Sequence, residues 1–518
     1  MDGFQNGFSL QYTGPRTSRN SRNLRSAVAN PDILLSKIKK EVNEGRVAGP
    51  FSEPPFENLI VSPLGLVPKK QKGEFRMIHH LSYPEGGSIN DFIDPKLSSV
   101  QYTSFDAAIT FIQKLGRNCK LFKMDLKNAF RNLPIHPSDF HLLGFSFNGK
   151  FYFDKALVFG ASISCAIFER FARFLEFGVK SQMESGELIH YLDDFLGGDK
   201  DNQSCRNIML TFRSIMKELG VPLAEEKTEG PSEVIVFLGL ELDTNRMVVR
   251  IPQEKLDDIK CKILQILSKQ KTTLKELQSL IGSLNFCCRA IIIGRPFCRR
   301  LINKTCGLTK PYHHVRVTQG IRLDLLMWLK FFKEHNGVSV FHEQQWTTNA
   351  DLQLYSDSAG RHGLGFGVVF QNQWAQERWP ESWRALLSDI TVLELFPIVV
   401  ALFVWGKKLA NKKIMFHCDN MAVVHILNHL SSKSDKVMCL VRVLTLQCLS
   451  FNILIKAKHV EGIKNSVCDS LSRFQMSRFR QLAPAANREP TPMPNFLWDI
   501  FNREQEIWSK LGLHTIVD

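Results

Sequence analysis

Two neighbouring carboxylates, Asp193 and Asp194, lie between the short apolar runs 188–192 and 195–196. This pattern predicts a β-hairpin that carries the acidic pair at its tip. An acidic turn of this kind is common and usually inert, because Asp favours turns for reasons of backbone hydrogen bonding. A functional interpretation therefore needs a second signal elsewhere in the chain.

Such a signal lies upstream, where residues 120–124 predict a strand and Asp125 ends it. Phosphoryl transfer by two metal ions needs carboxylates from separate points of the chain, which bridge two Mg²⁺ ions held ~3.5–4 Å apart. Mg²⁺ takes oxygen ligands and keeps room for substrate phosphates. Asp125 together with Asp193 and Asp194 would supply such a site.

The length and charge of the chain set broader limits. A chain of 518 residues is too long for one ordinary domain and sufficient for three or four. Its formal net charge of +15 suits a polyanionic partner such as nucleic acid or an acidic membrane surface. The N-terminus lacks the charged start and apolar run of a secretory signal. The longest apolar stretch, 390–405, is shorter than the ~20 residues of a membrane span and contains Glu394, so it predicts a buried helix.

The 12 cysteines are scattered and form no Cys-x-x-Cys pair. One group of cysteines is followed by two histidines: Cys287, Cys288, Cys298 and Cys306, then His313 and His314. The spacings in this group match no common zinc-binding motif, so we expect its cysteines to be buried free thiols. Free thiols indicate a reducing intracellular compartment, the cytoplasm or the nucleus.

Local patterns predict further elements. Residues 1–30 are polar with Arg at every third position from Arg16 to Arg25, and we expect a disordered tail that can still hold phosphates. Helices are expected at 32–45, capped by Asp32, and at 166–180, 204–219 and almost throughout the lysine-rich 252–292. Residues 355–370 predict a second hairpin. The Pro-rich segment after Phe474 predicts a linker, followed by an amphipathic helix over 495–511.

A second acidic set lies in the C-terminal half. Asp357 begins the second hairpin, Glu394 lies in the apolar helix, and Asp419 ends the strand 414–418. His459 and Asp469 close the set. Each residue alone is usually structural, but a charged Glu394 in an apolar helix would be costly without a partner. A metal site supplies that partner.

The first acidic set resembles the palm motifs of reverse transcriptases in residues, order and separation. The motifs that carry this resemblance are Lys123 to Phe130, Phe159-Gly160-Ala161-Ser162, Tyr191-Leu192-Asp193-Asp194, Glu226-Lys227 and Phe237-Leu238-Gly239, with Val67 to Lys70 and Gly73 to Arg76 resembling the fingers segment. The resemblance implies RNA-directed DNA synthesis with two Mg²⁺ ions per active site, Mn²⁺ being the alternative metal.

The resemblance also implies roles for single residues. Lys69 and Arg76 would grip the triphosphate, which is sensible because cations offset polyphosphate charge. Phe130 would screen the sugar 2′-oxygen by bulk, implying deoxynucleotides, and Lys227 would assist the pyrophosphate leaving group. Phe159, Gly160 and Tyr191 would complete the substrate site. Phe159 departs from the pattern, since retroviral enzymes carry Gln there.

The second acidic set resembles the ribonuclease H fold of retroelements. That fold uses four carboxylates for two metal ions and a His near the leaving group. By this resemblance Asp357, Glu394, Asp419 and Asp469 would be the ligands, and His459 would assist proton transfer. Glu461 and Cys468 stand where Pro and Ala are usual, and neither departure removes a ligand.

The runs 45–51 and 78–84 are similar to DIRS-like retrotransposon polymerases of animals, and the chain contains no retroviral protease motif. The implied architecture is a mixed α+β and α/β multidomain fold, a right-hand polymerase followed by an RNase H-like domain. Its expected parts are a basic tail and leading helix (1–50), fingers and palm (51–240), a helical thumb or connection (241–345), RNase H (346–475), and a linker and amphipathic tail (476–518).

The implied partners are an RNA template, a DNA primer, an RNA:DNA hybrid and dNTPs, with a recombinase or Gag-like protein of the same element and no membrane. Two alternatives remain. One is a catalytically silent or domesticated remnant that only binds nucleic acid, although all seven carboxylates being present argues against it. The other is a hydrolase with a polymerase half that serves as scaffold, which an intact Arg76 and Phe130 argue against.

Overall fold

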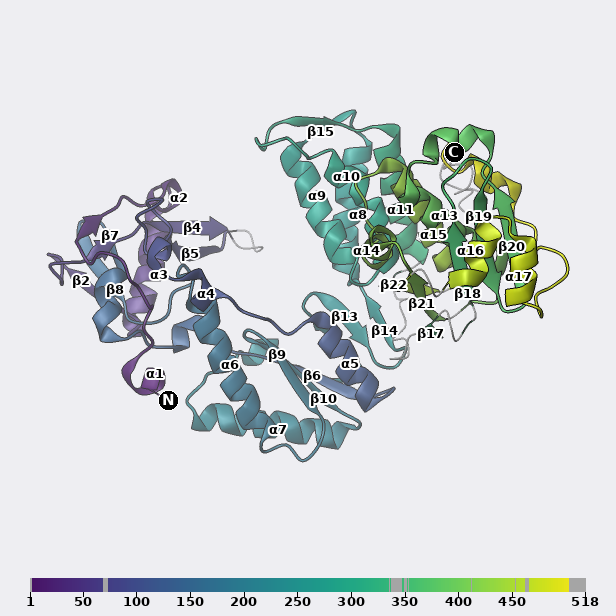
Figure 1. The fold of residues 1–518 in the computed structure, drawn as a ribbon. Helices are drawn as coiled ribbons and strands as arrows, with labels where there is room; N and C mark the ends of the chain where they lie inside the picture. The colour runs from purple at the N-terminus through teal and green to yellow at the C-terminus, as the bar shows by residue number, and fades with distance from the viewer. Residues whose placement is uncertain are drawn as a thin grey trace. The chain divides into compact units, whose positions relative to one another are not determined.

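The computed structural model describes residues 2–68, 73–334, 336, 347–348, 352, 354–410, 412–451, 453–461 and 465–502. The chain divides into two compact units (Figure 1). Unit 1 comprises Met1–Leu238 and Leu242–Met247, and unit 2 comprises Gly239–Glu241 and Val248–Asp518. The boundary falls among three short strands, β12 (Val234–Phe237), β13 (Leu240–Asp243) and β14 (Val248–Arg250).

The first residues of unit 1 are packed, so the prediction of a disordered tail was wrong. They form α1 (Asp2–Asn6), β1 (Arg19–Asn20) and α2 (Arg25–Val28). Leu10 is 0% exposed within the main core of unit 1, and Arg16 Nη2 lies 3.1 Å from the buried Asp139. Phe8, Leu10 and Tyr12 alternate with polar side chains, and burial of these apolar groups offsets the entropy of ordering the chain.

The helix expected at 32–45 is present as α3 (Pro31–Asn43). The expectation that Asp32 caps it was wrong, because Asn30 occupies the N-cap and Pro31 the first helical position. Asp32 instead lies in the first turn, where a negative charge interacts favourably with the helix dipole.

Two sheets pack against α3. One has five strands in the order β1-β3-β7-β8-β2, where β2 is Val47–Phe51, β3 Ile60–Val61, β7 Gly144–Phe147 and β8 Lys150–Asp154. The other is the hairpin of β4 (Leu64–Pro68) and β5 (Phe75–His79), in which Val67 pairs with Arg76. α3 packs on both β2 and β5 around Leu34 and Ile38, and this packing fixes the strand that carries Arg76.

The central sheet of unit 1 is antiparallel, with the order β11-β6-β10-β9. Its strands are β6 (Lys120–Asp125), β9 (Glu187–Tyr191), β10 (Asp194–Asp199) and β11 (Glu229–Ser232). Helices α5 (Phe105–Leu115), α6 (Ser164–Lys180) and α7 (Asn202–Glu218) pack on it. The strand at 120–124, the hairpin and the helices expected at 166–180 and 204–219 are thus confirmed. The shorter elements are η1 (Asn90–Phe92), α4 (Pro95–Ser98), η2 (Ala129–Asn132), η3 (Pro137–Leu142) and η4 (Glu225–Lys227).

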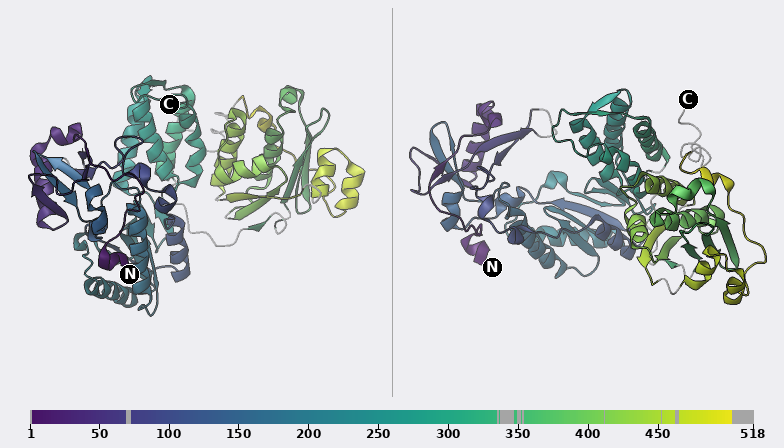
Figure 2. Two further views of the ribbon diagram at one scale, coloured as in Figure 1. Left: turned by 60° about the vertical axis from the view of Figure 1, so that its left-hand side comes forward. Right: turned by 45° about the horizontal axis from the view of Figure 1, so that its top comes forward.

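The first half of unit 2 is mostly helical (Figure 2, teal). It contains α8 (Gln253–Leu267), β15 (Lys271–Thr273), α9 (Leu274–Cys287), η5 (Ile292–Phe297), α10 (Arg299–Asn303), β16 (His314–Arg316) and α11 (Gln319–Glu334). The nearly continuous helix expected over 252–292 is interrupted by β15. Thr273 and Glu276 form a capping box there, which starts a new helix. Of the four cysteines expected to be buried, Cys287 and Cys298 are buried and Cys288 is partly buried, but Cys306 is exposed, so the expectation was wrong for it.

The second half of unit 2 combines strands and helices (Figure 2, green to yellow). The parallel strands are β17 (Thr347–Thr348), β21 (Lys413–Cys418) and β22 (Leu454–His459), and the antiparallel strands are β18 (Leu354–Ser358), β19 (Gly365–Phe370) and β20 (Gln373–Arg378). The helices are η6 (Glu381–Leu386), α13 (Ile390–Trp405), α14 (Met421–His429), α15 (Asp435–Ser450) and α16 (Ser466–Ser472). The hairpin and the apolar helix expected here are confirmed. In the part of the chain that the structure describes, no helix is long and apolar enough to cross a membrane.

A buried carboxylate lies between the two halves of unit 2. Asp324 of α11 is 0% exposed, and its Oδ1 lies 3.3 Å from Arg300 of α10 and 3.8 Å from Arg442 of α15. Because a buried charge is costly without partners, this group ties the helical half to the α/β half.

The segment after Phe474 is not a linker over residues 476–502, and that prediction was wrong. It forms α17 (Met476–Leu482) and η8 (Asn495–Asp499), and Phe479, Leu497 and Ile500 are fully buried. Trp498 stacks on Phe396 of α13 with ring centroids 5.3 Å apart. Large apolar side chains spaced between the prolines anchor the segment on the α/β half. The rest of the helix expected over 495–511 lies outside the described residues from 503 onward.

Replacing Trp498 by alanine is therefore expected to destabilise unit 2 by about 3 kcal/mol, since it leaves a cavity against Phe396. Urea denaturation of the full chain, followed by circular dichroism, measures this change. Phe177→Ala is the control, because Phe177 is 71% exposed and its loss is expected to cost about 0.5 kcal/mol or less. Equal denaturation midpoints for Trp498→Ala and the wild type would show that the segment contributes no stability.

Candidate functional site

The acidic pair lies at the tip of the β9–β10 hairpin. Tyr191 pairs with Asp194, so Leu192 and Asp193 form the turn, and Leu192 adopts a left-handed conformation with φ of 54°. In the adjacent ladder Asp194 pairs with Asp125 of β6. The Leu126 amide donates to the Asp193 carbonyl over 3.1 Å. The register therefore brings Asp125, Asp193 and Asp194 together.

The three carboxylates make this site strongly electronegative. Burial and the adjacent Asp125 raise the pKa of Asp194 to about 7, and burial also raises the pKa of Asp193. The Lys227 ammonium lies 3.0 Å from both carboxylate oxygens of Asp125. Burial opposes the charge of this lysine, but Asp125 and its neighbours outweigh burial and raise the pKa of Lys227. A cation thus already contacts the carboxylate that ends β6.

The donor chemistry fits Mg²⁺, which prefers carboxylate oxygens. Among the described residues, no three His, Cys, Asp or Glu side chains form a ready-made metal site. Mg²⁺ at nucleotide-binding sites typically uses one or two protein carboxylates and takes its other ligands from substrate phosphates and water. Asp125, Asp193 and Asp194 meet that smaller requirement.

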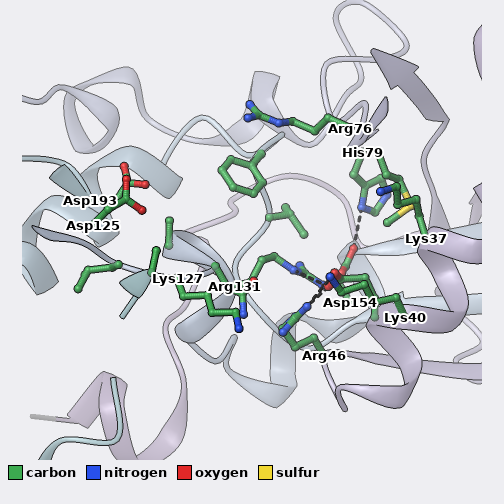
Figure 3. A pocket seen from close by; sticks show the side chains of 18 of the residues that line it. Lys37, Lys40, Arg46, Arg76, His79, Asp125, Lys127, Arg131, Asp154 and Asp193 are labelled. Atoms are coloured by element: carbon green, nitrogen blue, oxygen red, sulfur yellow. Dashed lines mark hydrogen bonds and ion pairs between the residues drawn. The ribbon is translucent and has the colours of Figure 1, made fainter. Parts of the chain in front are cut away.

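Asp125 and Asp193 line a cavity of about 490 Å³ in unit 1. Arg76 of β5 lies across it from Asp125 and Asp193 (Figure 3). Lys127 and Lys227 also line it, so cations flank the acidic end. This combination suits a substrate that carries several negative charges. Lys69, the other cation expected here, lies outside the described residues.

The aromatic residues that were expected to form the substrate site differ in how far they are exposed. Phe130 is 6% exposed, while Phe159 is 50% exposed and lines the cavity. Gly160 is needed for space, because a Cβ there would lie 1.9 Å from the His79 carbonyl oxygen. Tyr191 packs against Tyr102 with ring centroids 5.1 Å apart.

The cavity wall also contains a charge network that the sequence patterns did not indicate. The guanidinium of Arg131 donates to Glu41 of α3 over 2.9 Å and to Asp154 of β8 over 2.7 Å. His79 Nδ1 lies 3.1 Å from Asp154, and Arg46 donates to Glu41 over 2.8 Å (Figure 3). Arg131 and Glu41 are 90 residues apart, so no local spacing could have revealed the pair.

Replacing Arg131 by methionine is expected to destabilise the full chain by about 3 kcal/mol at pH 7, because the buried Asp154 would lose its guanidinium partner and keep only His79. Burial alone would raise the pKa of Asp154, but the charge of Arg131 and the contact with His79 outweigh it and hold that pKa below its usual range. A lowered pKa contributes stability that is present above the unfolded-state value and is lost as pH falls through the folded-state value.

In Arg131→Met the charge of Arg131 is lost at Asp154 while burial and the contact with His79 remain, so the pKa of Asp154 should rise and falling pH should cost the variant less stability than the wild type. The deficit relative to wild type is therefore expected to shrink between pH 7 and pH 4. Urea denaturation at both pH values measures it, with Arg213→Met as control, since Arg213 and Glu225 form a surface pair worth about 1 kcal/mol or less. A deficit that is independent of pH would contradict the role given to Asp154.

The second acidic set converges in the α/β half of unit 2. Asp357 lies on β18, Glu394 on α13, and Asp419 directly follows β21. Cys418 and His459 are partners in the parallel β21–β22 ladder, so Asp419 and His459 leave the same sheet edge. Burial, together with Asp357 and Asp419, raises the pKa of Glu394 to about 8. Burial, with Asp469 and Asp419, raises the pKa of Asp357 to about 6 against the Ser472 hydrogen bond.

Asp469 differs from the other three carboxylates because it forms ion pairs with two arginine side chains. Arg473 Nε donates to it over 2.6 Å, and Arg478 Nη1 over 3.0 Å. Ser472 Oγ donates to Asp357 over 2.6 Å. Arg478 belongs to α17, in the segment that had been expected to be a linker, so no local pattern could have predicted its presence at this site.

Comparison with known proteins relates the first site to a family. Residues 67–242 match the model of the family described as reverse transcriptase (RNA-dependent DNA polymerase). The chain is 24% identical over 227 residues to the Gag-Pol polyprotein of Walleye dermal sarcoma virus. The matched region covers 44% of this chain and 12% of the polyprotein. It is 23% identical over 285 residues to the transposon Tf2-7 polyprotein of Schizosaccharomyces pombe, covering 55% of this chain and 19% of that polyprotein. The chain thus spans less than a fifth of the length of these relatives.

Solved structures share the fold. The foamy viral protease-reverse transcriptase dRH in complex with double-stranded DNA matches with a TM-score of 0.52 and 17% identity, over 86% of this chain and 72% of that chain. The foamy viral protease-reverse transcriptase in complex with dsDNA matches with a TM-score of 0.51 and 16% identity, over 87% and 86%. The chain therefore has the mixed α/β multidomain fold of these proteins.

Proposed function

Because residues 67–242 form a reverse transcriptase domain related to those of retroviral and retrotransposon polyproteins, we propose that the chain is an RNA-directed DNA polymerase with a ribonuclease H centre in unit 2. The observation that carries the proposal is the grouping of three carboxylates at the end of β6 and the tip of the β9–β10 hairpin, two of which, Asp125 and Asp193, line one cavity with Arg76. In this proposal, residues 51–240 are fingers and palm, 241–345 the helical thumb or connection, and 346–475 the RNase H domain.

In the polymerase centre Asp125, Asp193 and Asp194 would hold two Mg²⁺ ions. When bound, these ions stabilise the charge that develops as the primer 3′-oxygen attacks the α-phosphate of a dNTP. Arg76 would hold the triphosphate, as would Lys69. Lys227, which contacts Asp125 in the structure, would exchange that contact for the pyrophosphate leaving group. Gly160 would let the backbone approach the nucleotide closely.

In the second centre Asp357, Glu394, Asp419 and Asp469 would hold metal ions, and His459 would assist proton transfer during cleavage of RNA in an RNA:DNA hybrid. The raised pKa values of Asp357 and Glu394 support the proposal, since they show carboxylates crowded in a buried site. Pairing of Asp469 with Arg473 and Arg478 keeps its charge balanced until a metal ion and substrate arrive.

The proposed partners are an RNA template, a DNA primer, their hybrid and dNTPs. Two solved relatives in the foamy viral group are described in complex with dsDNA and with an RNA/DNA hybrid, which supports this choice. The runs 45–51 and 78–84 support a place among DIRS-like elements, and a recombinase or Gag-like protein of the same element would then be a further partner.

Primer extension tests the polymerase proposal. The purified chain is expected to extend a labelled DNA primer on an RNA template with Mg²⁺ and dNTPs, and to stop when EDTA is added. A chain that binds the primer-template without extending it, with either Mg²⁺ or Mn²⁺, would favour the alternative of a silent nucleic-acid-binding remnant.

A further inference from the structure

One arginine, Arg131, joins separate parts of unit 1 at the wall of the cavity. Its guanidinium donates to Glu41 of α3 over 2.9 Å, to Asp154 of β8 over 2.7 Å and to the Ala156 carbonyl over 3.1 Å. The side chain is only 10% exposed. Arg131 belongs to η2, which follows Asp125 at the end of β6. The side chain therefore links the segment after a catalytic carboxylate to the elements around it.

The first link leads from Arg131 to the strand that carries Arg76 (Figure 3). The Asp154 carboxylate accepts from Arg131 and also lies 3.1 Å from His79 Nδ1. His79 is the last residue of β5, the strand of Arg76, and its Nε2 lies 3.1 Å from the Gly144 carbonyl oxygen. His79 and Asp154 are both buried, so these contacts are strengthened by the low local dielectric. The end of β5 is thereby fixed to η2.

The second link leads to the aromatic ring beside Arg76. Arg131 donates to the carbonyls of Ala156 and Leu157 over 3.1 Å and 3.4 Å, at the start of the loop that contains Phe159. The guanidinium carbon of Arg76 lies 5.7 Å from the centroid of the Phe159 ring, which is within cation–π range. Arg131 thus holds the loop, and the loop presents the ring to Arg76.

The hydrogen bonds of Arg131 also define what it does not do. Its Nε donates to Glu41 over 3.0 Å, its Nη1 to Ala156 and its Nη2 to Asp154, so each nitrogen of the guanidinium already has a protein acceptor. A triphosphate would have to displace these acceptors and leave buried carboxylates without their partner, which is costly. Arg131 therefore supports the site and leaves the triphosphate to Arg76.

We propose that Arg131 is a positioning residue, which fixes Arg76 relative to the catalytic carboxylates so that it can hold the triphosphate. This inference rests on the proposed polymerase function and adds a residue that acts on substrate binding through another residue. The planar fork of a guanidinium can serve two carboxylates and two carbonyls at once, whereas the ammonium of a lysine is a single point with three donors. Lysine would keep the charge of Arg131 but lose part of the links.

The effect should appear in binding of the nucleotide rather than in the chemical step. Arg76 is expected to contact the triphosphate both before and during the reaction, and loss of such uniform binding raises KM without changing kcat. A purely structural defect would instead lower the amount of active protein, which reduces kcat and leaves KM unchanged. The split between KM and kcat therefore separates positioning from stability.

Single-nucleotide incorporation on an RNA template with a DNA primer measures both constants for each full-length variant. Arg131→Lys is expected to raise the KM for the dNTP by ~10–100-fold, the scale of effect that a small misplacement of a positioned group produces. The kcat should change by less than about twofold, and the dissociation constant of the primer–template should stay unchanged. His79→Gln, which disturbs only the link through β5, should raise the KM for the dNTP less than Arg131→Lys does.

Ile208→Ala is the control for stability. Ile208 of α7 is buried beside Gly186, which precedes β9 at the end of the hairpin opposite Asp193. Removal of a buried isoleucine side chain costs about 2–5 kcal/mol, comparable with the loss expected for Arg131→Met. This variant should keep the KM of the wild type.

A double-mutant cycle tests whether Arg131 acts through Arg76. In an Arg76→Ala background, measured at raised dNTP concentration, Arg131→Lys should change KM much less than it does in the wild type, because residues that act together are not additive. Full additivity of the two substitutions would overturn the inference.

Two further results would overturn it while leaving the polymerase function intact. One is an unchanged KM in folded Arg131→Lys, and the other is an equal rise of KM in Ile208→Ala. If circular dichroism shows that Arg131→Lys does not fold, an unchanged KM in His79→Gln decides against the inference and a raised KM in its favour. A wild-type chain that incorporates no nucleotide would overturn the proposed function itself, and this inference with it.

Discussion

Asp193→Asn is expected to reduce DNA synthesis by at least ~10³-fold, because a neutral amide cannot replace a carboxylate that binds Mg²⁺, and several kcal/mol of transition-state stabilisation depend on that ion. The substitution preserves shape, and the turn at Leu192 and Asp193 tolerates asparagine, which adopts turn conformations readily. The fold should therefore survive while extension of a DNA primer on RNA stops.

The matched control is Asp201→Asn. Asp201 caps α7 in the same unit, and its side chain accepts from the amides of Gln203 and Ser204. Asparagine is an equally good N-cap, so this variant should extend primers at the wild-type rate. Wild-type extension by Asp193→Asn would contradict the assignment of the hairpin tip as the polymerase centre.

The second large effect is expected at the other acidic set. Asp419→Asn and Glu394→Gln should each reduce cleavage of RNA in an RNA:DNA hybrid by ~10³-fold or more, by the same loss of metal-binding oxygens. DNA synthesis should persist in both variants, because Asp419 and Glu394 belong to a different unit from Asp125 and Asp193. Release of short labelled RNA fragments from a hybrid measures the cleavage.

Glu377→Gln serves as the control for this pair. Glu377 is an exposed residue of β20 in the same half of unit 2, so its charge should not matter for cleavage. Undiminished cleavage by folded Glu394→Gln would mean that the buried glutamate of α13 is structural and that the RNase H proposal is wrong.

The sequence predicted those features that depend on neighbours along the chain. The strand pattern at 120–124 and the short apolar runs on either side of Asp193 and Asp194 were sufficient for β6 and the β9–β10 hairpin. The apolar run at 390–405, which only a few residues such as Glu394 interrupt, was sufficient for α13. In each case the acidic residue was placed correctly on its element because the element was short and strongly patterned.

Features that depend on tertiary packing could not be predicted in this way. Nothing local distinguishes Phe130 from Phe159, yet one is buried and the other lines the cavity. Arg131 finds its partners in α3 and β8, far away in sequence. The proline content after Phe474 suggested a linker, although Phe479 and Leu497 are fully buried. Composition indicates whether an isolated segment favours an ordered conformation. Whether the segment packs depends on the apolar surface that the rest of the fold presents to it.

The central claim is that this chain copies RNA into DNA at one centre and cleaves the RNA at another. One reaction tests it, with a 5′-labelled RNA template and a differently labelled DNA primer, incubated with Mg²⁺ and dNTPs. The wild type should give both extended DNA and shortened RNA. Asp193→Asn, given a preformed hybrid, should give only shortened RNA, and Asp419→Asn should give only extended DNA. The claim would be contradicted if either folded variant lost both activities. It would also be contradicted if either variant kept both activities.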